Sequence, residues 1–357
     1  MSESGPLKPS IKTLGAVRRK TISMSPDALI NTESLRPETP LPLVVKPAIE
    51  GVKLVAWAAS RREWIKTELM KAGGILFRNF NLKTATDLEE LIKAIAGDLL
   101  EYSYRSTPRS HVDGRVYTST EYPASQSILL HNEMSYTRRW PMKIAFFCAQ
   151  PAEQGGETPI ADSRGVFLRI DPKIRDRFIR KKVMYVRNYG DGMDLPWQNV
   201  FQTTDRAEVE DYCRNAGIEF EWTGHNRLRT RQVCQAVATH PWTGEMVWFN
   251  QAHLFHISSL DLALVESVLA EFQEEGLPRS AYYGDGSPIE TSVLDEIRDV
   301  YKQQAVVFPW QPGDVLLLDN MLVAHGRRPY VGPRKILVGM AEPMAGGDLS
   351  PECPPDK

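Results

Sequence analysis

The sequence predicts an antiparallel β-sandwich or barrel with helices packed against its outside. Segments of strand character outnumber helical segments in the second half of the chain, and turn signals rich in Gly and Pro separate them. These strands do not alternate with helices, as the parallel sheet of an α/β protein would require. The 357 residues, of which 42% are hydrophobic, are also enough to bury a large core.

The pattern along the chain indicates one large domain. Residues 1–45 are polar and rich in Pro and Ser, which is typical of an extended or disordered arm. Residues 46–342 form the expected single domain with helical insertions, and the region around 190–230 is a candidate lid. Residues 343–357 contain Pro and Gly without periodicity, so we expect a disordered tail.

Local patterns predict the first elements. Residues 61–71 have helical spacing and stop at Gly73 and Gly74, which is a signal for a helix C-terminus. Residues 75–80 are predicted to form a short buried strand. A second helix is expected from Thr86, where Thr86 and Glu89 match a capping box, to near residue 100.

The remaining elements follow in order. Strands are expected at 127–130, 143–150, 232–238 and 245–250, and helices at 171–180, 206–215 and 260–275. The stretch 190–204 between two of these helices is irregular. Residues 304–309 and 315–319 are predicted strands joined by a turn at 310–314, and 334–341 is the last strand.

Charge, hydropathy and cysteine content exclude several classes of protein. The formal net charge of −2 gives no basic field for nucleic acid, and no window approaches 18 apolar residues, as a membrane span requires. The four cysteines are far apart and form no CxxC pair, which argues against a disulfide framework and favours the cytoplasm. The basic N-terminus has no apolar run and is therefore not a secretory signal. The protein could be a monomer or a homo-oligomer.

A metal site is indicated by His131, Glu133 and His325. On a strand, residues i and i+2 point to the same face, so the side chains of His131 and Glu133 can reach one ion. Two His and one carboxylate form the ligand set of Fe(II) oxygenases. His325 follows the predicted strand 315–319 and is the best second His, whereas His253 and His256 are expected to lie on a loop edge or to pack near the pocket.

Two residues beyond this motif suit a dicarboxylate cosubstrate. Arg334 opens the last predicted strand, and its guanidinium can pair with a distal carboxylate such as that of 2-oxoglutarate. Thr158 lies in a Gly-rich turn and can donate a hydrogen bond to the same carboxylate. The alternative for Arg334 is a solvated surface side chain.

With these residues assembled, the chain resembles the taurine dioxygenase (TauD/TfdA) family of Fe(II)/2-oxoglutarate enzymes. The resemblance covers about residues 40–342 and rests on the sequence at 131–133, the Gly-Gly-Glu-Thr at 155–158, His325 and Arg334. A closer likeness is to a subgroup similar to the syringomycin-pathway aspartate hydroxylase. It rests on residues 118–123, 131–136, 151–164 and 248–251.

The resemblance implies an all-β core with flanking helices, arranged as a double-stranded β-helix (a cupin-like jelly roll). It implies Fe(II) held by His131, Glu133 and His325, 2-oxoglutarate held by Thr158 and Arg334, and O2 as the second cosubstrate. Many relatives carry Asp at the position of Glu133. The retained carboxylate argues against halogenation, and Val338 stands where relatives with acidic substrates often carry a second Arg.

The substrate implied is an amino acid or an amino-acid derivative in a natural-product pathway, either free or tethered to a carrier protein. Arg105 and Arg109 are candidates for holding its carboxylate, and Asn250 and Gln251 for holding an amide. Asp319 and Arg327 are expected to orient His325. Hydroxylation is the expected reaction. Desaturation, epoxidation, a metal-dependent isomerase and a binding protein that does not use 2-oxoglutarate remain alternatives.

Overall fold

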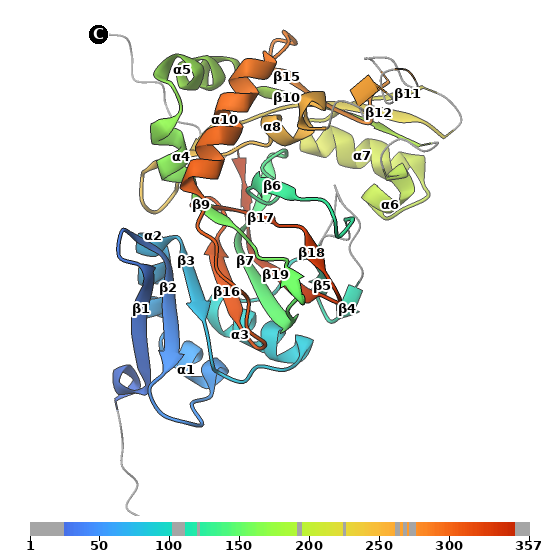
Figure 1. Ribbon diagram of the computed structural model, residues 1–357. Coiled ribbons are helices and arrows are strands. Elements are labelled where there is room, and N and C mark those ends of the chain that lie inside the picture. The colour runs from blue at the N-terminus through green and yellow to red at the C-terminus, as the bar shows by residue number, and fades with distance from the viewer. Residues whose placement is uncertain are drawn as a thin grey trace, which may run out of the picture.

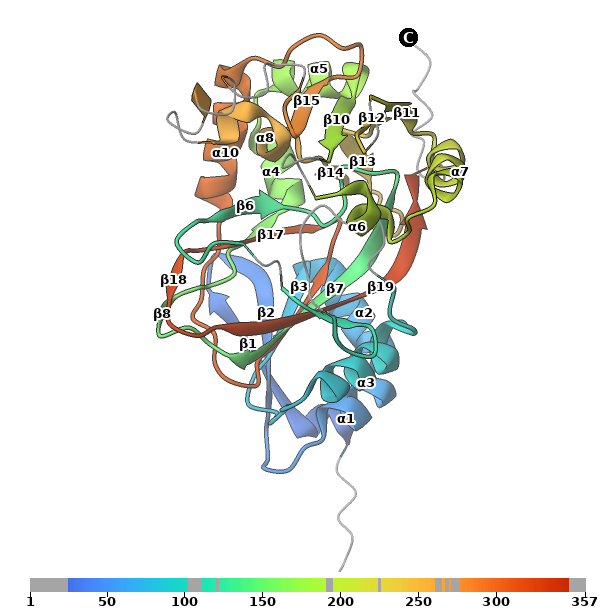
Figure 2. The ribbon, with the colours of Figure 1, turned by 90° about the vertical axis from the view of Figure 1, so that its right-hand side faces the viewer.

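The computed structural model describes residues 25–346, apart from 102–110, 120–121, 191–194, 224–225, 261–264, 267–269 and 271–275. Figures 1 and 2 show a lower part built on one large sheet and an upper part of helices around a smaller sheet. The fold is therefore mixed α/β with several sheets. Within the described residues, no helix combines the length and apolar character that a membrane span needs.

The large sheet has eight strands in the order β1-β2-β3-β16-β7-β19-β5-β4. Neighbouring strands are antiparallel except β2 and β3, which are parallel. The bounds are β1 (Ile30–Arg36), β2 (Thr39–Pro47), β3 (Gly74–Phe77), β16 (Val315–Asp319), β7 (Arg139–Gln150), β19 (Lys335–Ala345), β5 (Val116–Thr118) and β4 (His111–Asp113).

Both faces of this sheet are covered. Successive side chains of β7 alternate between two hydrophobic clusters, so Ala145 and Phe147 meet three helices while Ile144 and Phe146 face a second, smaller sheet. The helices are α1 (Leu54–Ser60), α2 (Arg62–Ala72) and α3 (Ala85–Ala96). Burial on both faces explains why β7 and β16 are almost continuously hydrophobic.

The second sheet has three short strands in the order β6-β17-β9, with a two-stranded ribbon of β18 and β8 beyond it. Side chains of both sheets, including Phe146 and Ile160, share one buried cluster. The bounds are β6 (Ile128–His131), β17 (Val323–Arg327), β9 (Ile160–Asp162), β18 (Tyr330–Val331) and β8 (Gln154–Gly155).

The upper part surrounds a separate hydrophobic cluster. Its four-stranded sheet has the order β11-β12-β10-β15, and β13 pairs with β14. The strands are β10 (Val183–Tyr189), β11 (Glu219–Trp222), β12 (Leu228–Cys234), β13 (Val237–Thr239), β14 (Met246–Trp248) and β15 (Arg279–Tyr283). The helices of this part are α4 (Ser163–Arg169), α5 (Pro172–Lys181), α6 (Trp197–Phe201), α7 (Arg206–Ala216), α8 (Ala252–Phe255), η2 (Ile257–Ser259) and α10 (Thr291–Gln304). One further short helix, η1 (Pro26–Leu29), precedes β1 in the lower part.

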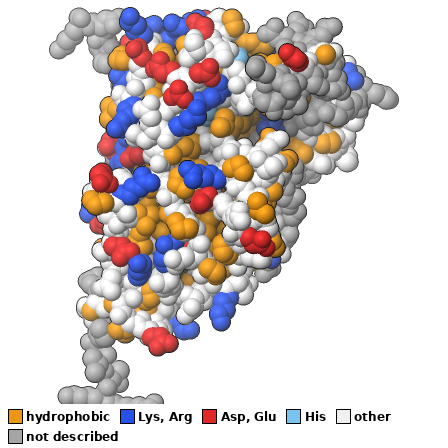
Figure 3. All heavy atoms as spheres, in the orientation of Figure 1, with side chains coloured by type: hydrophobic (Ala, Val, Ile, Leu, Met, Phe, Trp, Pro, Cys, Tyr) orange, Lys and Arg blue, Asp and Glu red, His pale blue; other side chains and the backbone are white. Residues whose placement is uncertain are grey.

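The outer surface in the view of Figure 1 carries charges of both signs. Figure 3 shows Lys and Arg side chains interspersed with Asp and Glu over this face. A mixed surface of this kind creates no large single-signed potential there.

Several helices and strands lie where the sequence predicted them, and others do not. The predicted helices at 61–71, 171–180 and 206–215 correspond to α2, α5 and α7. The arm expected at 1–45 is wrong from residue 26 onward, because β1 and β2 form the edge of the large sheet. The tail expected from 343 is wrong as far as Ala345, because β19 pairs with β7 up to that residue, and residues 347–357 lie outside the described part of the chain.

Two local predictions also need correction. The capping box of α3 is formed by Thr84 and Asp87, not by Thr86 and Glu89. Residues 304–309 form no strand beyond a bridge at Val306, and the long helix α10 precedes them. The described residues of the candidate lid at 190–230 form α6, α7 and β11. Most of the helix predicted at 260–275 lies outside the residues that the structure describes.

Candidate active site

Three side chains with metal-binding groups converge where β6 meets β17. His131 is the last residue of β6 and lies directly opposite His325 of β17, and Glu133 follows in the next turn. One ligand atom from each of the three lies within 4.8 Å of the others, and His325 Nε2 is 3.9 Å from Glu133 Oε2. This triad of two imidazoles and a carboxylate is the ligand set of non-haem Fe(II) oxygenases.

A hydrogen bond fixes the tautomer of His131. Its Nδ1 lies 2.7 Å from the carbonyl oxygen of Leu129, which can only accept, so Nδ1 carries the proton. The lone pair of Nε2 is then available for a metal. The ring of His325 packs against Phe146 with the ring centroids 4.9 Å apart, which restricts its orientation.

Glu133 is placed by a turn and not by the strand periodicity that predicted it. The chain leaves β6 after His131, and Met134 adopts a positive φ of 57°. Asn320, between β16 and β17, holds this turn. Its Oδ1 accepts from the Glu133 N–H at 2.7 Å, and its Nδ2 donates to the Glu133 carbonyl oxygen at 2.9 Å.

A second asparagine completes the attachment. The buried Nδ2 of Asn132 donates to the carbonyl oxygen of Asn320 at 2.7 Å and to Ser163 Oγ at 3.0 Å. Each asparagine side chain therefore binds the other's segment of main chain. The sequence analysis missed Asn320, although the polar pair Asp319-Asn320 directly after a buried strand was a usable signal.

Replacing Asn320 by alanine is expected to weaken metal binding about 10- to 100-fold, as loss of an outer-shell partner usually does. The change leaves the buried Glu133 N–H without its acceptor and frees the turn. Titration with Co(II), followed by its visible absorption, measures the affinity. Asn226→Ala, which removes an asparagine that binds Trp197 and Gln198, is the matched control. Unchanged Co(II) affinity in folded Asn320→Ala would contradict this role.

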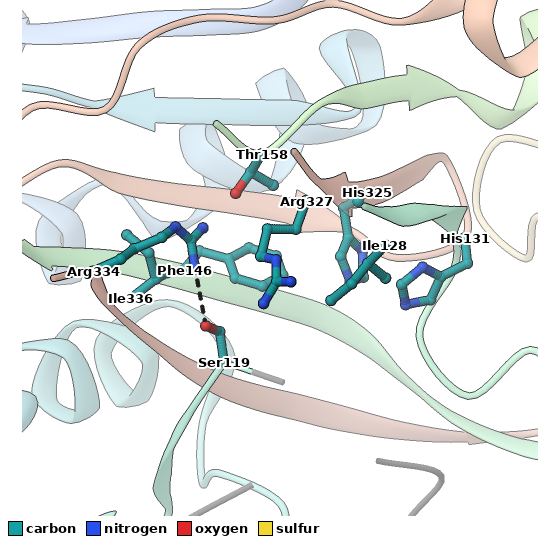
Figure 4. Close-up of a pocket in the computed structure, with 10 residues that line it drawn as sticks. Ser119, Ile128, His131, Phe146, Thr158, His325, Arg327, Arg334 and Ile336 are labelled. Atoms are coloured by element: carbon teal, nitrogen blue, oxygen red, sulfur yellow. Dashed lines mark hydrogen bonds between the residues drawn. The ribbon is translucent and has the colours of Figure 1, made fainter. Parts of the chain in front are cut away.

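A pocket extends from the two histidines between the sheets. It holds about 390 Å³ of empty space, part of which is open to solvent. Figure 4 shows His131 and Arg334 at opposite ends, with Arg327 between them. The lining residues are Ser119, Ile128, His131, Phe146, Thr158, His325, Gly326, Arg327, Arg334 and Ile336.

Arg334 enters this pocket from the start of β19. Its Nε donates to the carbonyl oxygen of Gly156 at 2.9 Å, and Nη1 lies 3.4 Å from Ser119 Oγ. Burial, together with the charge of Arg327, lowers the pKa of Arg334 to about 10. None of the described residues that line the pocket is acidic, so these two guanidinium groups make it a site for an anion.

Gly156 is required by this arrangement. It has a φ of 72°, and a Cβ atom there would lie 3.0 Å from both Cδ and Nε of Arg334. A larger residue would be strained and would displace the guanidinium.

The residues expected to orient His325 make their contacts elsewhere. The buried carboxylate of Asp319 binds Lys143 Nζ at 2.8 Å and accepts from the amides of Met321 and Leu322. Arg327 donates to the carbonyl oxygens of Tyr122, Pro123 and Gln126. Asp319 thus shapes the turn that leads to β17, and Arg327 holds the segment before β6 against the pocket.

The amides expected to hold substrate are used inside the protein instead. Asn250 is fully buried and binds Ala236 and Ala252, and Gln251 Nε2 donates to the Asn132 carbonyl oxygen at 2.8 Å. Neither lines the pocket. Arg105 and Arg109 lie outside the described residues.

His253 and His256 do not join the triad. The side chain of His253 is buried in α8, and its Nε2 lies 2.9 Å from the carbonyl oxygen of Leu130. Burial lowers the pKa of His253 to about 3, so the ring is neutral and supports β6.

The family model for taurine catabolism dioxygenases (the TauD, TfdA family) matches residues 35–341. The chain belongs to this family. Membership makes it an Fe(II)- and 2-oxoglutarate-dependent dioxygenase, and the triad of His131, Glu133 and His325 supplies the family's metal ligands.

Two known proteins are similar to this chain over most of its length. The dapdiamide synthesis protein DdaC of Enterobacter agglomerans is 43% identical over 276 residues, covering 77% of this chain and 84% of DdaC. A clavaminate synthase-like protein of Arabidopsis thaliana is 29% identical over 322 residues, which cover 85% of this chain and 94% of the plant protein.

Solved structures support the same fold. PvcB from Pseudomonas aeruginosa superposes with a TM-score of 0.55 at 14% identity, covering 94% of this chain and 98% of PvcB. At that identity the likeness concerns the TauD/TfdA fold alone.

The residues present fit an Fe(II) ion. Glu133 and His325 are buried and His131 is half-buried, the carboxylate is anionic, and the proton position on His131 leaves Nε2 for the metal. Bound iron supplies the oxidising chemistry, and the apolar side chains of Ile128, Phe146 and Ile336 keep water from the wall of the pocket beside it.

Proposed function

We propose that this dioxygenase hydroxylates an unactivated C–H bond of an amino acid or an amino-acid derivative in a natural-product pathway. The observation that carries the reaction class is the pocket that both histidines of the metal triad share with Thr158 and Arg334. The role in biosynthesis is supported by the 43% identity to a dapdiamide synthesis protein. The likeness to the syringomycin-pathway aspartate hydroxylase subgroup supports an amino-acid substrate, free or carrier-bound.

Within this proposal, Arg334 and Thr158 bind the distal carboxylate of 2-oxoglutarate. Arg334 is held by Gly156 and Ser119 and has no carboxylate partner among the described pocket residues. A bound carboxylate would satisfy its charge, and the 2-oxo acid end would then extend toward the histidines at the opposite end of the pocket.

The arrangement of the sheets supports a double-stranded β-helix around this site. The large sheet and the β6-β17-β9 sheet face each other across a shared cluster, and the triad lies between them. A jelly roll consists of two facing, mainly antiparallel sheets, so this arrangement supports one here.

Two other functions explain less of the pocket. A metal-dependent isomerase and a binding protein would each use the triad but leave Arg334 and Thr158 without a ligand. Desaturation and epoxidation use the same residues and differ only in which substrate bond lies nearest the metal.

An anaerobic titration with Fe(II) and 2-oxoglutarate tests the cosubstrate. We expect a weak visible charge-transfer band that appears only when both are present. Succinate release would then be measured with free amino acids and with the same amino acids on a carrier protein. A band without succinate release from any amino-acid form would reject the substrate class, whereas the absence of a band would reject the 2-oxoglutarate site.

A further inference from the structure

The hydroxyl oxygen of Thr158 accepts a hydrogen bond from the indole of Trp310. We infer that Trp310 orients this hydroxyl so that it donates into the pocket, which makes the pocket select a carboxylate over a neutral amide at that end of the ligand. The inference rests on the proposed 2-oxoglutarate site and identifies Trp310 as a residue that determines its specificity.

The chemistry of the indole group sets the direction. Trp310 Nε1 lies 3.2 Å from Thr158 Oγ1 in a buried contact. Because an indole N–H can only donate, the Thr158 oxygen is the acceptor, and its own proton must point elsewhere. A hydroxyl held in this way directs its proton away from the indole and offers a donor to a carboxylate. One of the two lone pairs with which a free hydroxyl could accept from an amide N–H is already in use.

Trp310 is held in place by a buried ion pair. The guanidinium of Arg78 binds the fully buried Asp314 with Nε–Oδ1 and Nη2–Oδ2 distances of 3.0 and 2.7 Å, and it also donates to the carbonyl oxygen of Pro309. Asp314 in turn accepts from the Gln311 N–H at 2.8 Å. The main chain is therefore fixed on both sides of the indole.

Thr158 is fixed in the same manner. The carbonyl oxygens on either side of it, of Glu157 and Pro159, accept from the amides of Arg328 and Gly326 at 3.0 and 2.9 Å. These bonds attach the Thr158 segment to β17, the strand that carries His325. Trp310 and Thr158 therefore cannot move apart unless hydrogen bonds of the neighbouring main chain are broken.

The test compares 2-oxoglutarate with its 5-amide, 2-oxoglutaramate, in the intact enzyme under anaerobic conditions with Fe(II). Trp310→Phe keeps an aromatic ring but removes the N–H. We expect the affinity for 2-oxoglutarate to fall about two- to tenfold and the affinity for the amide to change less. The ratio of the two affinities, which measures the selectivity for the carboxylate, should therefore become smaller. Thr158→Val should lower 2-oxoglutarate affinity about tenfold, and adding Trp310→Phe to it should have no further effect.

Phe308→Leu is the packing control, because the ring centroids of Phe308 and Trp310 lie 5.6 Å apart and a phenyl ring has no N–H to donate to the hydroxyl. It should change the melting temperature and leave the selectivity unaltered. Equal losses for both ligands in Trp310→Phe, or losses that add to those of Thr158→Val, would overturn the inference alone. Unchanged 2-oxoglutarate affinity in Thr158→Val would overturn the proposed role of Thr158, and the inference with it.

Discussion

Replacing Glu133 by alanine is expected to lower the affinity for Fe(II) by more than about 100-fold, and activity should fall with it. Glu133 is the one anion of the triad, and it is 3% exposed. Without it, two neutral imidazoles remain to hold a dication in a buried site. Co(II) titration of the purified variant and succinate release at a fixed iron concentration measure the two effects.

Two further variants sharpen this test. Glu133→Asp keeps the charge on a side chain one methylene shorter, so it should retain part of the affinity. Glu63→Ala, an exposed residue in the first turn of α2, controls for the loss of a carboxylate elsewhere. If Glu133→Ala binds Co(II) as tightly as Glu63→Ala does, Glu133 is not a metal ligand.

Replacing Arg334 by methionine is expected to lower 2-oxoglutarate affinity by about 100-fold or more while leaving the ligand-free protein as stable as before, or more so. A bidentate guanidinium–carboxylate pair supplies the first effect. The second effect follows from the pKa of Arg334, which burial and the charge of Arg327 lower to about 10. The folded state thus disfavours the charged guanidinium, so this charge costs stability below that pH.

Melting temperatures with and without 2-oxoglutarate and Mn(II) separate the two effects. Wild type should be stabilised by the ligand and Arg334→Met should not. Lys335→Met is the matched control, because Lys335 is the exposed neighbour of Arg334 at the start of β19. A ligand-dependent rise in Arg334→Met as large as in Lys335→Met would place the cosubstrate elsewhere.

The sequence was most informative about residues whose chemistry is rare. The choice of His131, Glu133 and His325 depended on ligand type and spacing, and Arg334 could be separated from Lys335 because alternate strand residues face opposite sides. Asn320 could not be found in this way. Its role depends on a turn in which Met134 has positive φ and on contacts between segments far apart in the sequence.

The fold predictions failed where the local pattern was ambiguous. β1 is an edge strand that is mostly exposed, so its polar composition resembled an arm. Helix α10 was not predicted, although its buried residues Leu294, Ile297, Val300 and Tyr301 follow one another at helical spacing. Asn250 and Gln251 bind main-chain groups, which the sequence could not show, because it does not reveal which side-chain amides the main chain itself uses.

The pairing of β17 with β6, and of β16 and β19 with β7, has a consequence for the order in which this protein matures. During synthesis His131 and Glu133 emerge from the ribosome long before His325. Among the described strands, β6 pairs with β17, so His131 gains its neighbouring strand only after residues 315–345 have emerged and docked. Iron loading therefore follows the last strand into place, and an enzyme that holds its metal is one whose two sheets have already closed.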